Sequence, residues 1–187
     1  GKPVIDDSFL HIPYDEKGQW DFGVDVITRF GYDWNRGRQD RAPHPFTIHF
    51  GIDDVRITTR FMPDYFSSAF FSTTHEFGHA LYELGVDRAL ARTPLARGTT
   101  MAMHESQSRL WENLVGRSLP FWQGFYPRLQ EIFPTQLGNV PLEKFYTSGF
   151  CIDLSHVPLK TAATLEEVQA AVAKSGQTIQ PGDTVLV

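Results

Sequence analysis

The segment FSSAFFSTTHEFGHALYELG, from Phe66 to Gly85, carries His75, Glu76 and His79 in the pattern H-E-x-x-H. Successive residues of a helix turn by about 100°, so the two histidines lie one turn apart on one face, where two imidazoles can bind one metal ion. Glu76 projects from the flank of that face, which suits a general base beside a metal. The segment is therefore predicted to be a helix that carries two ligands of a metal site.

The opposite side of the same segment is apolar, which predicts a helix packed into a core. Its members are Phe66, Phe70, Phe77, Leu81 and Leu84. Asp64 is predicted to cap the start of the helix, and Gly85 to end it. Pairs of histidines at this spacing also arise by chance on amphipathic helices, so the motif alone leaves a purely structural helix open.

Glu105, in AMHESQSRLWENL, offers the third ligand that a catalytic zinc site needs if one position is to stay open for water. Between His75 and Glu105 the chain holds the end of one helix, a connection and the start of a second helix, predicted from Met101 to Ser118. Glu105 can therefore fold back onto the two histidines. Neutral imidazoles and an ionised carboxylate suit Zn²⁺ near pH 7, one ion per chain, with Co²⁺ or Mn²⁺ as substitutes.

The sequence around this motif resembles the carboxypeptidase Taq family of zinc metallocarboxypeptidases. HEFGHALYE is preceded by DVRITTRF and followed by MHESQSRLWENLVGRS, and the resemblance extends over about residues 22–146. It includes HPFT at 44–47 and TPLARG at 93–98. Several blocks in the same order are far more specific than the metal motif alone.

The resemblance implies that His75, His79 and Glu105 are the zinc ligands and that Glu76 is the catalytic base. Members of the family are all-helical and much longer than this chain, and two later blocks, I-R-x-x-A-D and G-x-x-Q-D-x-H-W, are absent here. Those blocks help to build the far wall of the substrate cleft. Family members often pair, so a homodimer is the partner expected to cover apolar surface left by the absent part.

Further site residues are candidates with two interpretations each. Arg56, in a D-x-R-x-T block with Asp54, either holds a substrate carboxylate or forms an ion pair with Asp54. His104 either donates a hydrogen bond to the reacting carbonyl or is a structural histidine. Tyr146 approaches the cleft in the family's context and either assists the oxyanion or packs. Arg109 is a weaker candidate for the carboxylate-binding cation.

The remaining pattern predicts mainly α-helices with a small β-sheet, an α+β fold with a zincin-like metallopeptidase core. The segment 46–61 alternates and is rich in β-branched residues, which predicts two short strands. The segment 35–45 is predicted to be a loop. Further helices are expected at 20–33, at 119–133 with a bend near Pro127, and at 140–146.

The character of the chain changes after Tyr146, so the predicted domains are a peptidase core at 1–146 and an appended tail at 147–187. In the tail, strands at CIDLSHVPL and DTVLV flank a helix capped by Thr164 and ended by Gly176, a short β-α-β unit. The tail resembles a segment of the cyclase family that includes kynurenine formamidases. The metal motif of that family is absent, so its activity is not carried over.

Composition excludes several kinds of partner. The net charge is −5 and no basic cluster is present, which argues against nucleic acid. No apolar run is long enough to cross a bilayer and the start does not resemble a signal peptide, so no membrane partner is expected. Cys151 is a single cysteine, which is typical of a cytoplasmic protein.

The predicted function is hydrolysis of peptide bonds in a peptide or protein substrate. Zinc activates a water, and Glu76 takes its proton and passes it to the leaving amine. A carboxypeptidase is implied by the resemblance, and an endopeptidase with an opened cleft is the alternative. A non-catalytic remnant or binding module stabilised by zinc is a third reading, favoured by a closed coordination shell.

Overall fold

The computed structural model describes residues 8–145, 149–151, 163–176 and 184–186. The chain divides into two compact units, one of residues 6–140 and one that contains 141–187 together with residues 1–5. Each unit is described by itself. None of the described helices is both long and apolar enough to cross a membrane.

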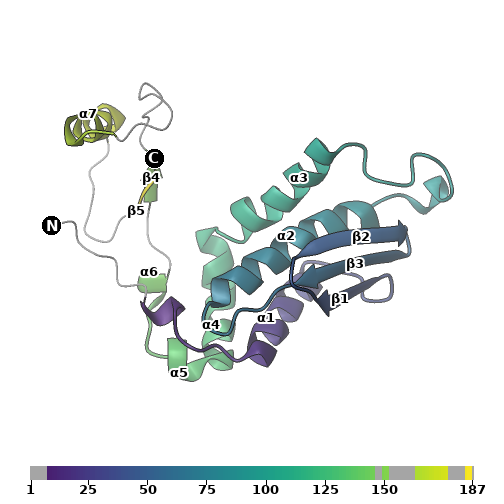
Figure 1. The fold of residues 1–187 in the computed structure, drawn as a ribbon, viewed down its shortest axis with the longest axis horizontal. Coiled ribbons are helices and arrows are strands. Elements are labelled where there is room, and N and C mark those ends of the chain that lie inside the picture. The colour runs from purple at the N-terminus through teal and green to yellow at the C-terminus, as the bar shows by residue number, and fades with distance from the viewer. Residues whose placement is uncertain (1–7, 146–148, 152–162, 177–183, 187) are drawn as a thin grey trace. The chain divides into compact units, whose positions relative to one another are not determined.

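The unit of residues 6–140 is mostly helical with one small mixed sheet (Figure 1). Its elements in chain order are η1 (Ser8–Leu10), α1 (Glu16–Arg29), β1 (Gly37–Arg41), β2 (Phe46–Gly51), β3 (Asp54–Thr59), α2 (Phe66–Leu84), η2 (Arg88–Leu90), α3 (Met101–Arg109), η3 (Leu110–Val115), α4 (Leu119–Ile132) and α5 (Pro134–Leu137). The fold class predicted from the pattern is confirmed at this level, as mainly helical with a small sheet.

The sheet has the strand order β1-β3-β2, with β1 parallel and β2 antiparallel to β3. The prediction of a loop at 35–45 is wrong, because Gly37–Arg41 forms β1. Its sequence, GRQDR, has no β-branched residue, so the strand is held by its backbone pairing with β3 rather than by side-chain propensity. One side chain of β1 is buried, that of Gln39, which donates to the hydroxyl of Thr59.

Helix α2 packs against the sheet and against α1, and its residues join two parts of the core. Phe77, Ala80 and Leu84 share a buried cluster with Val55 and Ile57 of β3. The earlier turns of α2 bring Phe66 and Phe70 into an aromatic cluster with Phe22, Phe121, Trp122 and Phe133. The apolar face read from the sequence is the buried face.

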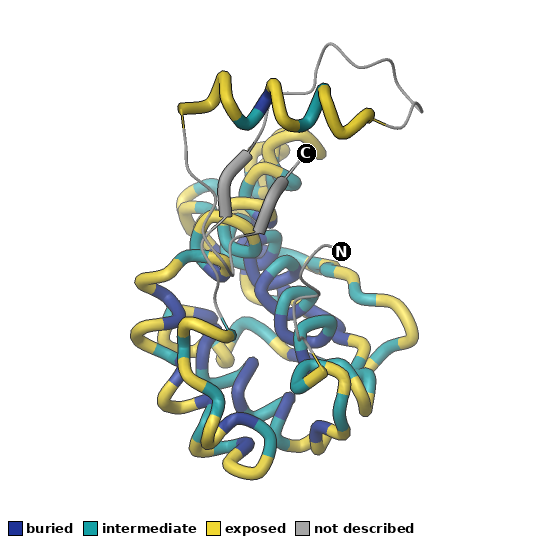
Figure 2. Tube along the Cα trace, turned by 90° about the vertical axis from the view of Figure 1, so that its left-hand side faces the viewer, coloured by how far each residue is buried: buried dark blue, intermediate teal, exposed yellow. Residues whose placement is uncertain are grey.

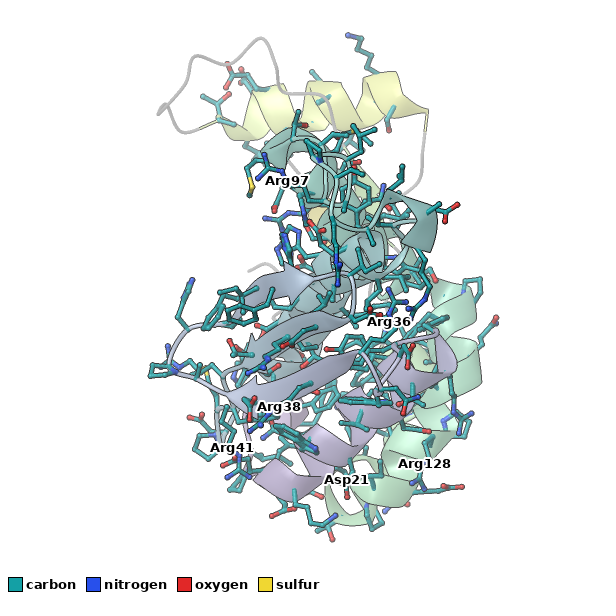
Figure 3. The ribbon with its side chains drawn as sticks, turned by 90° about the vertical axis from the view of Figure 1, so that its right-hand side faces the viewer. Asp21, Arg36, Arg38, Arg41, Arg97 and Arg128 are labelled. Carbon is teal, nitrogen blue, oxygen red and sulfur yellow. The ribbon has the colours of Figure 1, made fainter. Side chains whose placement is uncertain are left out.

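The ends of α2 differ in part from the prediction. The helix begins after Tyr65, whose side chain makes no capping hydrogen bond, so Asp64 is not its N-cap. Gly85 follows the last residue as predicted, and its amide donates to the carbonyl of Leu81. Arg36, labelled in Figure 3, donates to the carbonyl of Leu84, so a side chain from the sheet satisfies one of the free carbonyls at this end.

The second helix of the predicted metal site is not a continuous α-helix. Regular α3 ends at Arg109, and Leu110–Val115 forms a π-helical stretch in which the amide of Gly116 donates to the carbonyl of Trp111 over 2.8 Å. A π-helical stretch rotates the residues that follow it relative to a straight helix.

The other unit contains α6 (Leu142–Phe145), β4 (Gly149–Cys151), α7 (Leu165–Ser175) and β5 (Thr184–Leu186). Strands β4 and β5 pair in parallel, and α7 has the predicted caps: Thr164 forms a capping box with Glu167, and Gly176 has φ 68°. Most of α7 is exposed, with Ala171 as its buried residue (Figure 2). The predicted first tail strand lies beyond Cys151 outside the described residues, and the domain boundary at 146 stays a prediction.

Candidate metal centre

The close crossing of α2 and α3 is what brings the motif residues together. Gly78 lies between the two histidines of the motif, and a Cβ at this position would meet the backbone of Gln107 and Ser108 at 2.7 Å. The absence of a side chain lets the two helix backbones approach to a distance that no other residue allows. Glu105, three residues before Ser108, is thereby carried to the face of α2 that bears His75 and His79.

The three predicted ligands do converge. The Nε2 atoms of His75 and His79 lie 3.6 Å and 3.4 Å from Oε2 of Glu105. One donor atom from each of the three side chains lies within 4.8 Å of the others. Donor atoms around a tetrahedral zinc ion, with bonds of about 2.0–2.2 Å, lie about 3.3–3.6 Å apart. The donor set and its spacing therefore fit one divalent ion of the zinc type.

His75 is oriented by a carboxylate on its other nitrogen. Its Nδ1 lies 2.9 Å from Oε2 of Glu112, in the π-helical stretch η3. Glu112 also accepts hydrogen bonds from Arg109 and Arg117, each over 3.1 Å. Burial raises the pKa of Glu112, but the hydrogen bonds from His75 and Arg117 outweigh it, so the net pKa is below the usual value. The carboxylate therefore stays ionised and holds the His75 ring with Nε2 toward Glu105.

Glu105 is half exposed and is held from its own helix. Arg109 donates to its Oε1 over 2.8 Å, and Ser108 donates to Oε2 over 3.2 Å. Burial acts to raise the pKa of Glu105, while the hydrogen bond from Arg109 and the charge of His75 lower it, and the net pKa lies below its usual value. The hydrogen bond from Arg109 and the charge of His75 thus favour the ionised form of Glu105, which is the form that binds a metal.

Glu76 is buried, with 7% of its surface exposed, and has a partner on the sheet. Thr47 of β2 donates from Oγ1 to Oε2 of Glu76 over 2.6 Å, and the same Oγ1 lies 3.0 Å from the Glu76 carbonyl oxygen. Burial raises the pKa of Glu76, and the hydrogen bond from Thr47 partly offsets this. A buried carboxylate with a raised pKa is a stronger base than an exposed one.

His79 is joined to a second buried carboxylate through His104. Its Nδ1 lies 3.1 Å from Nδ1 of His104, and Nε2 of His104 lies 2.5 Å from Oε1 of Glu83. Burial lowers the pKa of His79, and the neighbouring rings of His75 and His104 lower it further. A low pKa keeps His79 neutral, as a metal ligand must be.

Comparison with known proteins identifies the family of the chain. The sequence model of the carboxypeptidase Taq (M32) metallopeptidase family matches residues 2–159 of the chain. The chain belongs to this family. The match includes both helices that carry the candidate ligands.

Individual relatives are 39% to 50% identical to this chain over the matched region. The thermostable carboxypeptidase 1 of Thermus thermophilus is 49% identical over 141 residues, which are 75% of this chain and 28% of that protein. Carboxypeptidase 1 of Bacillus subtilis is 39% identical over 140 residues, with the same shares of 75% and 28%. The crystal structure of the M32 carboxypeptidase from Deinococcus radiodurans R1 is 50% identical, with a TM-score of 0.73 over 74% of this chain and 28% of that one.

The chain thus spans about 28% of the length of the M32 relatives that it matches. Its mostly helical fold with a small sheet is similar to the corresponding part of M32 carboxypeptidases.

One other predicted site residue, Arg56, does not join the metal cluster among the residues that the structure describes. Arg56 forms an exposed bidentate pair with Asp54, with distances of 2.7 Å and 2.8 Å. Its neighbours Val55 and Ile57 are fully buried against α2, so Arg56 lies on the opposite face of β3. Its guanidinium also lies over the ring of Phe50, 5.2 Å from the centroid.

Tyr146 lies outside the described residues. Arg109 contacts two carboxylates of the centre, those of Glu105 and Glu112, rather than standing free.

Three residues around the centre were not found from the sequence: Thr47, Glu83 and Glu112. A signal exists for two of them. Glu83 lies four positions after His79 and continues the histidine face of α2 by one turn. Glu112 lies two helical turns after Glu105. Thr47 has no such signal, because its contact with Glu76 depends on how β2 packs against α2.

Proposed function

We propose that this chain forms the metal centre of a zinc-dependent peptidase that acts as a carboxypeptidase. The observation that carries the proposal is the convergence of three side chains in a member of the M32 metallopeptidase family. Oε2 of Glu105 lies 3.6 Å from Nε2 of His75 and 3.4 Å from Nε2 of His79. His75, His79 and Glu105 would hold the ion. When bound, zinc lowers the pKa of a water ligand and polarises a substrate carbonyl.

Glu76 is the residue of this chain that we assign to proton transfer. Thr47 occupies Oε2 of Glu76, so Oε1 is the oxygen left to take a proton from the attacking water. The same oxygen then delivers the proton to the leaving amine. The raised pKa of Glu76 supports both steps, because it brings the group closer to neutral pH. His104 has a different role, argued below, because its ring nitrogens face His79 and Glu83.

The carboxyl terminus of a peptide is the proposed substrate, by the names of the relatives. Arg56 stays a prediction for the cation that binds a terminal carboxylate, and its pairing with Asp54 supports the alternative interpretation.

Two matched peptides, one with a free C-terminus and one amidated, test the proposal. Each is incubated with the zinc-loaded protein, with and without a chelator, and the products are identified by mass spectrometry. Stepwise loss of residues from the free-ended peptide alone, abolished by the chelator, is the expected result. Internal cuts in both peptides would instead establish an endopeptidase. The absence of cleavage with zinc bound would overturn the catalytic role and leave a structural metal site.

A further inference from the structure

Glu83 is an acidic side chain in an unfavourable position. It is 3% exposed and lies in the last turn of α2, where the helix dipole places partial negative charge. A buried carboxylate is tolerated only if donors replace its lost hydration. Two donors reach it from the α2–α3 connection and from α3: the backbone amide of Gly98, 3.1 Å from Oε1, and Nε2 of His104.

Gly98 leaves no space beside these groups. A Cβ at residue 98 would lie 2.5 Å from Nε2 of His104 and 2.9 Å from Oε1 of Glu83. The backbone at residue 98 therefore packs directly against both side chains. His49 of β2 approaches the same carboxylate from the other side, with Nδ1 at 3.6 Å from Oε1.

For a neutral His104, the positions of the protons follow from this chain of contacts. A neutral imidazole has one N–H and one lone pair. A neutral His104 must direct its N–H from Nε2 to Glu83, because the reverse would set a lone pair against a carboxylate oxygen at 2.5 Å. Nδ1 of His104 then carries the lone pair. The 3.1 Å contact with His79 is a hydrogen bond only if His79 donates from its own Nδ1.

We infer that Glu83, acting through His104, is a positioning residue that holds His79 in the tautomer whose Nε2 lone pair faces Glu105 and is free to bind a metal ion. The inference rests on the metal site proposed above. His75 reaches the same state by a shorter route, since Glu112 accepts directly from its Nδ1. The tautomers of the two histidines of one motif are thus held by different carboxylates, directly for His75 and through the imidazole of His104 for His79.

Ring-nitrogen NMR shifts of the histidines in the metal-free protein test this directly, at about pH 8.5, where an unperturbed imidazole is neutral. In the unsubstituted protein we expect the proton on Nδ1 of His79 and on Nε2 of His104. Glu83→Leu removes the acceptor and should leave both rings as mixtures of tautomers. Glu83→Gln keeps an acceptor oxygen and should preserve the proton on Nδ1 of His79 and on Nε2 of His104. His104→Phe removes the imidazole that links Glu83 to His79 while keeping an aromatic ring. This variant makes the same test if Glu83→Leu does not fold.

Zinc affinity, measured by competition with a chelating dye, is the second readout. Loss of the outer partner of a metal-binding histidine typically weakens metal binding by about 10–100-fold, which is the change expected for Glu83→Leu and His104→Phe. Glu112→Leu is the matched control, since it removes the acceptor of Nδ1 of His75, and it should disturb that ring while leaving the tautomer of His79 unchanged.

A proton on Nε2 of His79 in the unsubstituted protein, or unchanged His79 shifts and zinc affinity in both Glu83→Leu and His104→Phe, would overturn the relay. Failure of the unsubstituted protein to bind zinc would refute the metal site instead. The two failures are distinguishable because the ring shifts are read without metal.

Discussion

Helices α2 and α7 are both amphipathic, but α7 is defined by its capping residues and α2 by tertiary burial. Helix α7 has strong local signals, a complete capping box at Thr164 and a left-handed glycine at 176, and buries one residue. Helix α2 has no side-chain cap at its start, yet eleven of its residues are buried. Caps determine where a helix begins and ends, whereas tertiary burial supplies most of the stability of a helix. The helix with the weaker local signals is the one that carries three of the proposed site residues.

The largest expected effect comes from Glu76 on α2, with an exposed glutamate of α7 as its control. Glu76→Gln on α2 should lower kcat by about 10²–10⁴-fold, because a positioned general base contributes that much. Zinc binding should persist, because Glu76 is not among the converging ligands. Peptide hydrolysis and metal content measure the two effects. Glu166→Gln, the same change at an exposed position of α7, should alter neither, and retained activity in Glu76→Gln would refute the assigned role.

Phe77→Ala tests how far burial holds α2. Phe77 is fully buried between the sheet and Trp111, and truncation of such a residue lowers the free energy of unfolding by about 3–5 kcal/mol. Leu165→Ala on α7 removes a side chain that is 71% exposed and should change stability by less than about 0.5 kcal/mol. Urea denaturation measures both. Equal losses would contradict the contrast between the helices.

Gly78→Ala should destabilise the protein, although glycine to alanine inside a helix is usually stabilising. The new Cβ would meet the backbone of α3 at 2.7 Å, and overpacking of this kind costs about 1–3 kcal/mol. Separation of α2 from α3 should also weaken zinc binding, since Glu105 moves with α3. Gly124→Ala is the matched control: its Cβ would meet nothing within 4 Å, so it should stabilise α4 by about 0.5–1 kcal/mol.

At both helices a threonine hydroxyl donates a hydrogen bond to a glutamate carboxylate. Thr47 donates to Glu76 of α2, and Thr164 donates to Glu167 of α7. At α2 the contact acts on the pKa of the proposed base. Thr47 stabilises the ionised form of Glu76, so Thr47→Val should raise the pKa of Glu76 further. The acid limb of the pH profile of kcat/KM, where activity falls as Glu76 is protonated, should then move to higher pH. Thr47→Ser keeps the hydroxyl and should leave the limb in place, and an unmoved limb in both would contradict the coupling.

At α7 the threonine serves the backbone, and the effect should be small and local. Thr164→Ala removes the cap and should weaken α7 by about 1 kcal/mol, seen as faster hydrogen exchange of the amides in 165–175. The global free energy of unfolding of the core unit should not change. Asp64→Ala, at the cap position predicted for α2, should leave the exchange of α2 unaltered, because α2 starts without a side-chain cap.

Much of the candidate metal centre could be predicted because its residues follow the periodicity of a helix. His75 and His79 lie one turn apart on any helix, and the apolar residues on the other side determine which face is buried. The caps of α7 are equally local, which is why Thr164 and Gly176 were predicted as they occur. The interpretation of Glu105 as third ligand needed a resemblance as well, since nothing local places it on α2.

What only the tertiary structure decided lies in contacts between elements. Strand β1 forms because β3 offers a partner, although the GRQDR sequence has no strand propensity of its own. Thr47 meets Glu76, and Glu83 meets His104 and Gly98, because the sheet and the α2–α3 connection pack against α2. Helix periodicity determined that His75 and His79 lie on one face of α2. The partners that orient those residues come from distant parts of the chain, whose approach depends on packing rather than on any local pattern.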